Sequence, residues 1–491
     1  MTLYDTKKFR WSAFAALLVF SVLLGYRVIF FNGTFRGITS PDAWQAKPLE
    51  AGESWMNVFQ NGRKIGFTRR ILETIGEEYR IQEETVMNIN TMGMTQEIRV
   101  KSVSTTGMDF AFKSFDFEIA SGSFDFSLKG EIKNNVLYLS DGSTKIPLEN
   151  RPYLASGITQ AVVASGLEEG QEMIIFVFDP STLGQAPAEI KVLGEENIIH
   201  DGNEVKTRKI LLRFRGSKQF AWLDEAGNVI KEQGMLGITL VKTDREGALD
   251  GLPLESSEDL TRLASVASNK TFENPEKLDQ LKVKIRNIDD LIEGGVFSLN
   301  QGRQKWENGT LTITKEFIIN DQFSEKAFSE AVQGIDPMFR DADTFIQSDH
   351  PKIKNIAERI VKQSDPPLEK VKKFVAWIQQ NIKRQPVLSM PNALSTLENR
   401  MGDCNEHAAL FAAFCRAAGI PAKIEAGLVY LNGRFYYHAW NLVFVEQWIT
   451  VDSLFNQIPA DVTHITFSSG SQDLQLDLLG MMGKVELEII D

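Results

Sequence analysis

The sequence predicts an α+β protein with three parts: one N-terminal transmembrane helix, a large antiparallel β domain, and a C-terminal domain of helices packed on an antiparallel sheet. Three patterns predict this class: an apolar run near the N-terminus, alternating strand-like segments over residues 50–250, and helical patterns followed by a hairpin signal after residue 350. The chain of 491 residues has room for about two to four domains.

The composition is that of a soluble body on an anchor. Hydrophobic residues make up 43% of the chain and charged residues 24%, which is ordinary for a globular protein. The formal net charge of −12 argues against nucleic acid as a partner, because nucleic-acid-binding surfaces are basic. We identify no cofactor motif, so no cofactor is predicted.

The apolar run over residues 11–31 predicts a membrane anchor. It would span about 31 Å as a helix, which is enough to cross a hydrocarbon core. Lys7, Lys8 and Arg10 precede it, so residues 1–10 are expected in the cytoplasm and the body in the periplasm of a bacterium. A cleaved signal peptide is the alternative, but the run is longer than the apolar region of such a peptide.

The segment after the anchor predicts strands. Asn61-Gly62 is a hairpin signal, and alternating apolar residues recur up to residue 250 with little helical pattern except near residues 158–165. One large antiparallel sheet or half-barrel is therefore expected, with most of its phenylalanines in a core. The pattern loosely resembles periplasmic half-barrels that carry lipids or lipoproteins, which implies a lipid or protein partner at this domain.

The remaining boundaries follow from changes in pattern. Residues 251–345 contain two short strand-like runs, and the tail alternates at Val485, Leu487 and Ile489. The predicted segments are 1–10 (cytoplasmic), 11–31 (anchor), 32–48 (linker), 49–250 (β domain), 251–345 (connector with a small β segment), 346–465 (catalytic domain) and 466–491 (C-terminal strand and tail).

Cys404, one of two cysteines, is predicted to begin a helix. Asp403 is a good N-cap, and Glu406 three residues later completes a capping box. In the first turn, free N–H groups and the helix dipole favour a thiolate, so we expect the pKa of Cys404 to lie well below that of a free thiol. Cys415 lies about 16 Å further along the same helix, beyond disulfide reach, and is expected in the core.

Two hairpins are predicted to follow this helix. The Asn432-Gly433 turn places Gly427 opposite His438, where the glycine would leave room for the helix end. A second hairpin centred on Val445 would place Asp452 directly across from His438 on its other side, on the same face of the sheet. A slip of one residue would move Asp452 to the wrong face.

A thiol, an imidazole and a carboxylate in this order are the components of a nucleophile, a base and an orienting group. His407 is a rival base, although we expect it to pack or hydrogen-bond locally. A metal site formed by Cys404, His407 and His438 would need a fourth ligand, so no metal is predicted. Cys404 as an inert cysteine is the remaining alternative.

Three separated blocks resemble the core of the transglutaminase-like superfamily, which has a papain-like fold. The blocks are Gly402-Asp403-Cys404, Ala418-Gly419-Ile420-Pro421-Ala422 and His438-Ala439-Trp440, and Trp448 to Asp452 follow them. The resemblance implies that Cys404 is the nucleophile, His438 the base and Asp452 the orienting group.

Members of this superfamily include crosslinking acyltransferases, peptidases and amidases, which attack a carboxamide to form a thioester. A protein or peptide substrate is therefore implied, and we favour hydrolysis over crosslinking. No side chain is identified that would stabilise an oxyanion, and Trp377 is expected to pack in the core. The alternative from another class is a binding or assembly protein that uses the fold as a scaffold.

Overall fold

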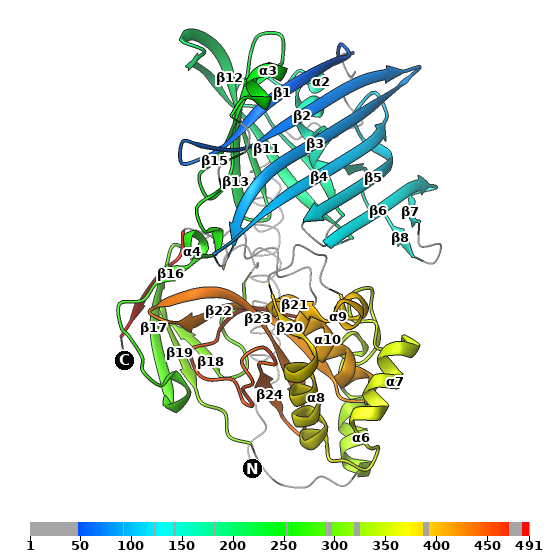
Figure 1. Ribbon diagram of the computed structural model, residues 1–491, viewed down its shortest axis with the longest axis vertical. Helices are drawn as coiled ribbons and strands as arrows, with labels where there is room; N and C mark the ends of the chain where they lie inside the picture. The colour runs from blue at the N-terminus through cyan, green and yellow to red at the C-terminus, as the bar shows by residue number, and fades with distance from the viewer. Residues whose placement is uncertain are drawn as a thin grey trace, which may run out of the picture.

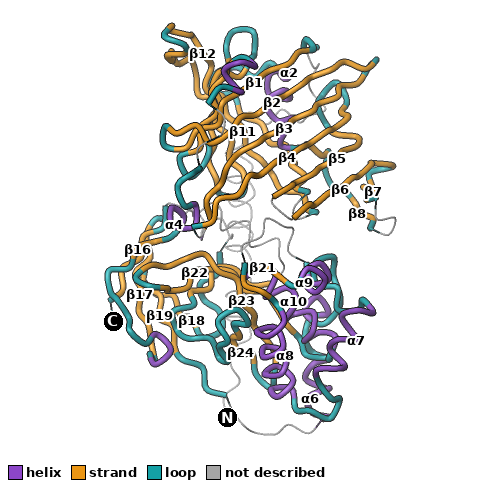
Figure 2. The backbone as a smooth tube through the Cα atoms, viewed as in Figure 1, coloured by secondary structure: helices purple, strands orange, loops and turns teal. Residues whose placement is uncertain are grey.

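The computed structural model describes residues 48–490 except for short gaps at 92, 122–123, 141–143, 181–182, 252–253, 255, 290–291, 293–296, 319–324, 386–391 and 471–483. The predicted anchor at residues 11–31 and nearly all of the linker at 32–48 lie outside the described residues. Within the described part, no helix is long and apolar enough to cross a bilayer. The chain forms a curled sheet and a second body of helices and smaller sheets (Figures 1 and 2).

The first body is a 15-stranded sheet with the strand order β8-β7-β6-β5-β4-β3-β2-β1-β15-β14-β13-β12-β11-β10-β9. Its neighbouring strands are antiparallel except for β9 and β10. The strands are β1 (Gly52–Gln60), β2 (Arg63–Ile75), β3 (Glu78–Thr91), β4 (Met94–Thr106), β5 (Phe112–Ser121), β6 (Phe124–Lys133), β7 (Val136–Leu139), β8 (Lys145–Pro147), β9 (Pro152–Tyr153), β10 (Glu172–Asp179), β11 (Gly184–His200), β12 (Asn203–Phe214), β13 (Ser217–Leu223), β14 (Val229–Gln233) and β15 (Ile238–Thr243). This confirms the predicted large antiparallel domain.

The sheet curls because its two halves share apolar cores. One core joins β3 to β10–β13 around the helix α2 (Ile158–Ser165), and another joins Phe112 and Phe115 of β5 to Phe178 of β10. The predicted Asn61-Gly62 hairpin connects β1 and β2. Both turn residues have positive φ angles, 49° and 84°, as a type I′ turn requires.

The second body contains the sheet β16-β23-β22-β25, to which β24 adds beside β23. A four-stranded sheet of order β18-β19-β17-β26 lies on one side of it, and the helices lie on the other side in Figure 1. The strands are β16 (Val266–Ala267), β17 (Gln280–Arg286), β18 (Gln304–Glu307), β19 (Thr310–Thr314), β22 (Ala422–Leu431), β23 (Arg434–Phe444), β24 (Trp448–Val451), β25 (Ile465–Gly470) and β26 (Glu486–Ile489). The helices are α6 (Glu325–Gln333), α7 (Pro351–Ile360), α8 (Pro367–Asn381), α9 (Ala393–Asn399) and α10 (Cys404–Ala417).

Hairpin β22–β23 connects the two cores of this body. Ala422 and Ile424 at one end pack with the helices, and Leu428 and Phe435 at the other end pack with the four-stranded sheet. The predicted C-terminal strand is present as β26, which pairs with β17. A short parallel pair, β20 (Lys383–Arg384) and β21 (Met401–Gly402), leads into α10.

The two bodies are joined by residues between β15 and β17. This segment contains α3 (Arg245–Leu249) and α4 (Leu260–Ala264), and its strand β16 pairs with β23. Arg434 of β23 donates to the hydroxyl of Ser265 at 2.6 Å. Phe345 is buried in the core that contains Phe112 and Phe178, so the second body also contributes a side chain to the first.

Gly427 lies opposite His438, as predicted, but the space beside it has a different occupant. A Cβ atom at Gly427 would lie 1.9 Å from the carbonyl oxygen of Ile465 and 3.1 Å from the Trp440 ring. The missing side chain therefore makes room for β25, not for the start of α10. The expectation about the helix end was wrong because β25 passes over Gly427, and no local signal in the sequence marks this third strand.

We expect Gly427→Ala to destabilise the second body by about 1–3 kcal/mol, because a backbone atom must move to accommodate the methyl group. Urea unfolding followed by tryptophan fluorescence measures the effect. Gly52→Ala is the matched control, since a Cβ there meets nothing within 4 Å. Equal unfolding midpoints for the two variants would contradict the close approach.

Candidate active site

Cys404 is the first residue of α10 and follows the N-cap Asp403. Both halves of the predicted capping box are present. The Asp403 side chain accepts a hydrogen bond from the backbone N–H of Glu406, and the Glu406 side chain accepts one from the Asp403 N–H at 2.9 Å. Asp403 also accepts from the Asn405 N–H at 3.0 Å. Cys404 is half-buried, and the backbone N–H of Ala439 donates toward its sulfur. The thiol therefore lies beside the strand that carries His438.

Burial raises the pKa of the Cys404 thiol well above its ordinary value, and the charge of Asp403 raises it further. The N–H of Ala439 opposes this shift without reversing it. The expected lowering of this pKa was wrong. The helix dipole favours the thiolate, but the burial of the thiol and the negative charge of the residues that cap the same helix outweigh it. The resting thiol is therefore protonated.

His438 lies on β23, which alternates between two environments. Ala439 packs with the helices, and Asn441 donates to the Ala408 carbonyl of α10 at 3.0 Å. His438 and Trp440 consequently point to the other face of the strand. The His438 ring stacks on Phe455 with centroids 4.7 Å apart. No hydrogen bond joins the Cys404 thiol to His438, although both residues are in the described part of the chain.

The hairpin between β23 and β24 differs from the predicted register. Phe444 pairs with Trp448, so the turn is centred on Glu446, which has a φ of 95°, and not on Val445. By this register Asp452 falls across from Trp440 and diagonal to His438. Trp440 and His438 share a face, so the carboxylate still reaches the imidazole. The shift was unpredictable because the turn sequence carries no glycine, proline or asparagine signal.

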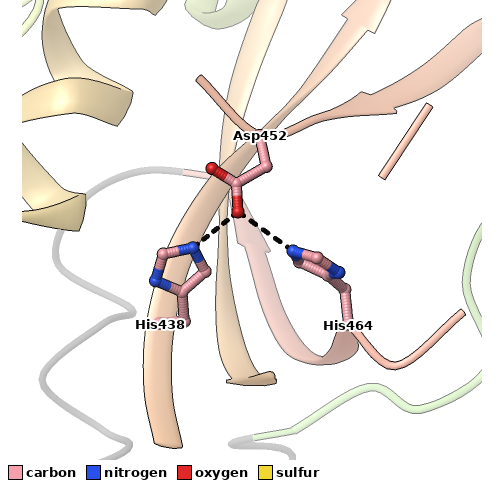
Figure 3. Close-up of side chains that lie close together, drawn as sticks. All are labelled: His438, Asp452 and His464. Carbon is pink, nitrogen blue, oxygen red and sulfur yellow. Dashed lines mark hydrogen bonds and ion pairs between the residues drawn. The ribbon is translucent and has the colours of Figure 1, made fainter. Parts of the chain in front are cut away.

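Asp452 is buried and accepts four hydrogen bonds. Its Oδ2 accepts from Nε2 of His438 at 2.7 Å, and its Oδ1 accepts from the backbone N–H groups of Leu454 and Phe455 at 2.8 and 2.9 Å. The fourth partner is a second imidazole, that of His464, whose Nε2 lies 3.0 Å from the same Oδ2 (Figure 3). Although burial alone would raise the pKa of Asp452, its electrostatic interaction with His438 and the hydrogen bonds from both imidazoles hold it well below its usual range.

His464 was not identified from the sequence. It is fully buried, and its Nδ1 lies 3.3 Å from Oδ1 of Asp461. Burial alone would lower the pKa of His464, but its hydrogen bonds to Asp452 and Asp461 raise it to about 8. No local motif marks this residue, because it reaches Asp452 through a loop and not through a strand pair.

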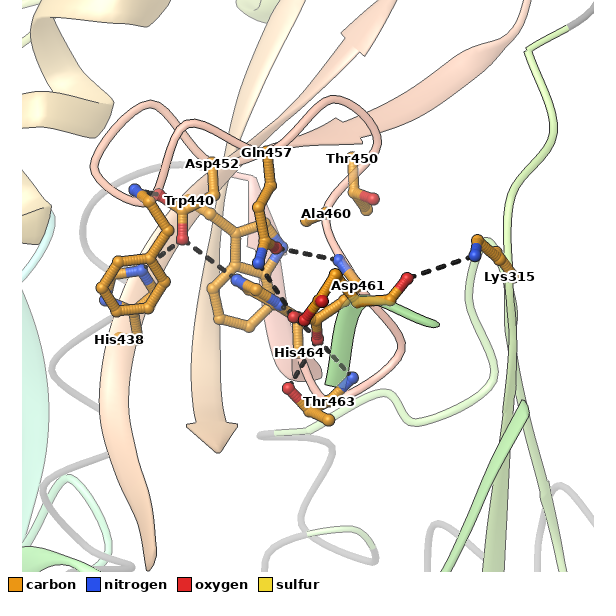
Figure 4. Close-up of polar contacts among 12 residues, drawn as sticks. Lys315, His438, Trp440, Thr450, Asp452, Gln457, Ala460, Asp461, Thr463 and His464 are labelled. Atoms are coloured by element: carbon orange, nitrogen blue, oxygen red, sulfur yellow. Dashed lines mark hydrogen bonds and ion pairs between the residues drawn. The ribbon is translucent and has the colours of Figure 1, made fainter. Parts of the chain in front are cut away.

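Asp461 is held in turn by its own loop and by the connector (Figure 4). The N–H of Thr463 donates to its Oδ1 at 2.8 Å, and Gln457 donates to its Oδ2 at 2.9 Å. Arg303, from the segment before β18, donates to the carbonyl oxygens of Ala460 and Asp461. Residues that the sequence assigned to a separate connector therefore support the loop behind Asp452.

A buried carboxylate also lies behind Trp440. Glu425 of β22 accepts from the indole N–H of Trp440 at 2.8 Å and from the hydroxyl of Thr466 at 3.2 Å. Burial raises the pKa of Glu425, although the charge of Arg303 acts against this shift. These contacts fix the indole that packs edge-on against His464, with ring centroids 5.0 Å apart.

Three other residues near the candidate site lie where the sequence predicts them. His407 is buried, and its Nδ1 lies 2.7 Å from the Asp403 carbonyl oxygen, which is the predicted local hydrogen bond. Cys415 is free and fully buried in the helical core. Trp377 is partly buried and packs against Phe414 of the helical core, with ring centroids 5.3 Å apart, which agrees with the predicted packing role.

The donor atoms of His438, Asp452 and His464 lie within 4.8 Å of one another, and these residue types can ligate a divalent cation. Both Nε2 atoms, however, face Oδ2 of Asp452 as hydrogen-bond donors. Asp461 behind His464 also favours the protonated ring, which cannot bind a metal. We therefore assign the cluster to proton chemistry.

The raised pKa of His464 predicts a loss of stability at alkaline pH. The folded-state pKa of about 8 exceeds the unfolded value of about 6.5, so the stabilisation is complete below about pH 6.5 and is lost as pH rises through about 8. The shift corresponds to roughly 2 kcal/mol. Urea unfolding of the second body at pH 6 and pH 9 should show this loss in the wild type and a smaller one in His464→Gln. His200→Gln, on β11, should follow the wild type, and parallel pH curves for all three would contradict the assignment.

Comparison with known proteins agrees with the resemblance read from the sequence. A family model described as the transglutaminase-like superfamily matches residues 354–453, a range that contains Cys404, His438 and Asp452. No curated protein matches the chain.

Solved structures match at low similarity. A β-barrel-like protein of a domain of unknown function from Brucella abortus is 11% identical, with 40% of this chain and 97% of that chain covered and a TM-score of 0.32. A candidate cysteine protease from Cytophaga hutchinsonii is 17% identical, with 46% and 87% covered and a TM-score of 0.27. The periplasmic domain of TgpA from Pseudomonas aeruginosa is 22% identical, with 25% and 49% covered and a TM-score of 0.21. TM-scores this low do not establish a shared overall fold. The family match shows that residues 354–453 form a transglutaminase-like domain.

Proposed function

We propose that the protein is a thiol enzyme that cleaves or transfers carboxamide or peptide bonds of a protein or peptide substrate. The single observation that carries the proposal is the hydrogen bond between Oδ2 of Asp452 and Nε2 of His438 in a transglutaminase-like domain. A carboxylate on Nε2 fixes the proton there and leaves Nδ1 as the free base. Cys404, beside Ala439 at the start of α10, is the proposed nucleophile.

In the proposed reaction, Nδ1 of His438 takes the thiol proton while the sulfur of Cys404 attacks the carboxamide carbon. The carbon–nitrogen bond then breaks, His438 gives the proton to the leaving amine, and a thioester remains on Cys404. Asp452 supports the imidazolium that forms between these steps. The backbone N–H of Cys404 is a candidate donor to the oxyanion.

The second half of the reaction releases the thioester to water or to an amine. His438 removes a proton from the incoming nucleophile and returns it to the Cys404 sulfur as the bond breaks. We favour water, because a site in the periplasm is wet and water reaches a thioester unless a tunnel excludes it.

The raised pKa of the Cys404 thiol bears on the order of events. A thiol that is protonated at rest must lose its proton during the attack, so His438 acts as a general base and not as the partner of a preformed thiolate. In the proposed mechanism the thiol–imidazole hydrogen bond forms when substrate binds, since catalytic hydrogen bonds are often absent or long in the free enzyme.

A non-catalytic scaffold is the second candidate function, and the same raised pKa favours it. In this case the β domain would bind a protein or lipid partner, and Cys404 would be inert. The two candidates differ in whether Cys404 acylates at neutral pH in a manner that depends on His438.

A thiol-directed acyl probe tests the proposed triad. We expect it to label Cys404 at pH 7 in the wild type and not in Cys404→Ala. His438→Ala should slow acylation by about 10²–10⁴-fold, and Asp452→Asn by a similar factor, because each change removes the correctly oriented base. Mass spectrometry of the labelled peptide over time measures these rates.

Cys415→Ala is the matched control, since it removes the buried thiol and should leave labelling unchanged. Normal acylation in His438→Ala together with loss in His407→Ala would transfer the role of base to His407. Absence of acylation in the folded wild type would favour the scaffold.

We also propose that residues 11–31 anchor the protein in the cytoplasmic membrane with the body in the periplasm. The proposal rests on the apolar run and on the basic residues Lys7, Lys8 and Arg10 before it. A reporter that is active only outside the cytoplasm should give signal when fused to the C-terminus, and the protein should stay with membranes after a salt wash. Recovery of a soluble form that begins near residues 32–47 would indicate a cleaved signal peptide instead.

A further inference from the structure

Two imidazoles donate to one carboxylate oxygen at the candidate site. The Nε2 atoms of His438 and His464 lie 2.7 and 3.0 Å from Oδ2 of Asp452 (Figure 3). The other nitrogen of the His464 ring, Nδ1, lies 3.3 Å from Oδ1 of Asp461. His464 therefore has a carboxylate oxygen at each of its ring nitrogens.

This geometry restricts the protonation state of His464. A neutral imidazole has one N–H group and one nitrogen lone pair. One of its two nitrogens would therefore place a lone pair against the lone pair of a carboxylate oxygen. An imidazolium carries two N–H groups and can donate to both carboxylates. The ring is also fully buried, so water cannot take the place of either partner.

We propose that His464 is a positioning residue, held as an imidazolium between Asp452 and Asp461, that fixes Asp452 and keeps His438 unprotonated in the resting protein. The inference deepens the proposed function and rests on it. His464, a residue outside the triad, would thus control whether the base His438 carries a charge.

The charges around His464 support this assignment. Asp452 and Asp461 face it directly, and the His438 ring lies 5.9 Å away between centroids. Further out, Arg303 donates to the carbonyl oxygens of Ala460 and Asp461. The carboxylate of Glu316 lies 3.9 Å from the Arg303 guanidinium. Glu425 accepts from the indole of Trp440, which packs on His464. Among the described residues that hydrogen-bond to Asp452, His438 is the other side chain that can carry a positive charge.

A cation at His464 competes with a cation at His438. Both would share one Asp452 oxygen, and two like charges about 6 Å apart in a poorly solvated site repel each other. The charge on His464 therefore opposes a second charge on the neighbouring His438 ring. A neutral His438 has a free Nδ1, which is the form that can accept the proton of a protonated Cys404 thiol.

The test follows the five histidines of the full-length protein by NMR after selective ¹⁵N-histidine labelling. In the wild type, His464 should carry two N–H protons up to about pH 8, and His438 should be neutral at pH 7. In His464→Gln the amide keeps a donor without the charge, and the titration midpoint of His438 should rise by about one pH unit or more, a tenfold gain in proton affinity.

Asp461→Asn keeps the imidazole and its volume but removes the second carboxylate. The midpoint of His464 should fall in this variant, and that of His438 should rise as in His464→Gln. His200→Gln, in the β domain, is the control and should leave the His438 midpoint unchanged. A purely structural role for His464 would lower stability without moving the His438 titration.

The inference is overturned if the His438 midpoint stays the same in both variants, or if His464 is neutral at pH 7 in the wild type. If the variants do not fold, the wild-type spectrum alone tests the inference, because it shows whether His464 is neutral at pH 7. The outcome is independent of turnover: shifted midpoints without Cys404 acylation would reject the proposed function and keep the charge assignment. Normal acylation with unmoved midpoints would reject only the role of His464.

Discussion

The buried carboxylate of Asp452 is the constraint on which the candidate site depends. A carboxylate removed from water is costly unless its lone pairs are satisfied, and here two imidazoles and two backbone N–H groups satisfy them. The backbone donors require the tight turn at Leu454 and Phe455, which in turn places the Phe455 ring on His438. Satisfying one charge thus sets the loop, the orientation of the base and the position of a second histidine.

The support for this loop comes from far away in the sequence. Arg303 and Gln304 hold the Asp461 and Thr466 backbones, and the sheet that carries Gln304 also takes in the C-terminal strand β26. Arg303 and Gln304, from the predicted connector, therefore support the candidate site. Since the sheet of this connector packs against hairpin β22–β23, a disturbance there would reach His438 through the Asp461–His464 contact.

Local signals were the part of the fold that the sequence could predict. The capping box at Asp403 and the Asn432-Gly433 turn each involve residues a few positions apart, and both are present with the expected register between Gly427 and His438. The turn at Glu446, the strand β25 and the placement of His464 depend on contacts between distant segments, for which one sequence offers no periodic signal. The prediction of a lowered pKa for Cys404 was wrong for the same reason, because burial is a property of the whole fold.

The arrangement of charges and the proposed location of the body are consistent with each other. In an oxidising compartment the thiolate is the form at risk, since it and not the thiol reacts with oxidants. A preformed thiolate–imidazolium pair would be exposed to this chemistry between turnovers. In the arrangement that we propose, a thiol whose pKa is raised by burial and a base kept neutral by a neighbouring imidazolium would hold the reactive form back until a substrate carbonyl is in place. The cost is a slower proton transfer at each attack. A site of this kind therefore favours survival of the nucleophile over intrinsic reactivity.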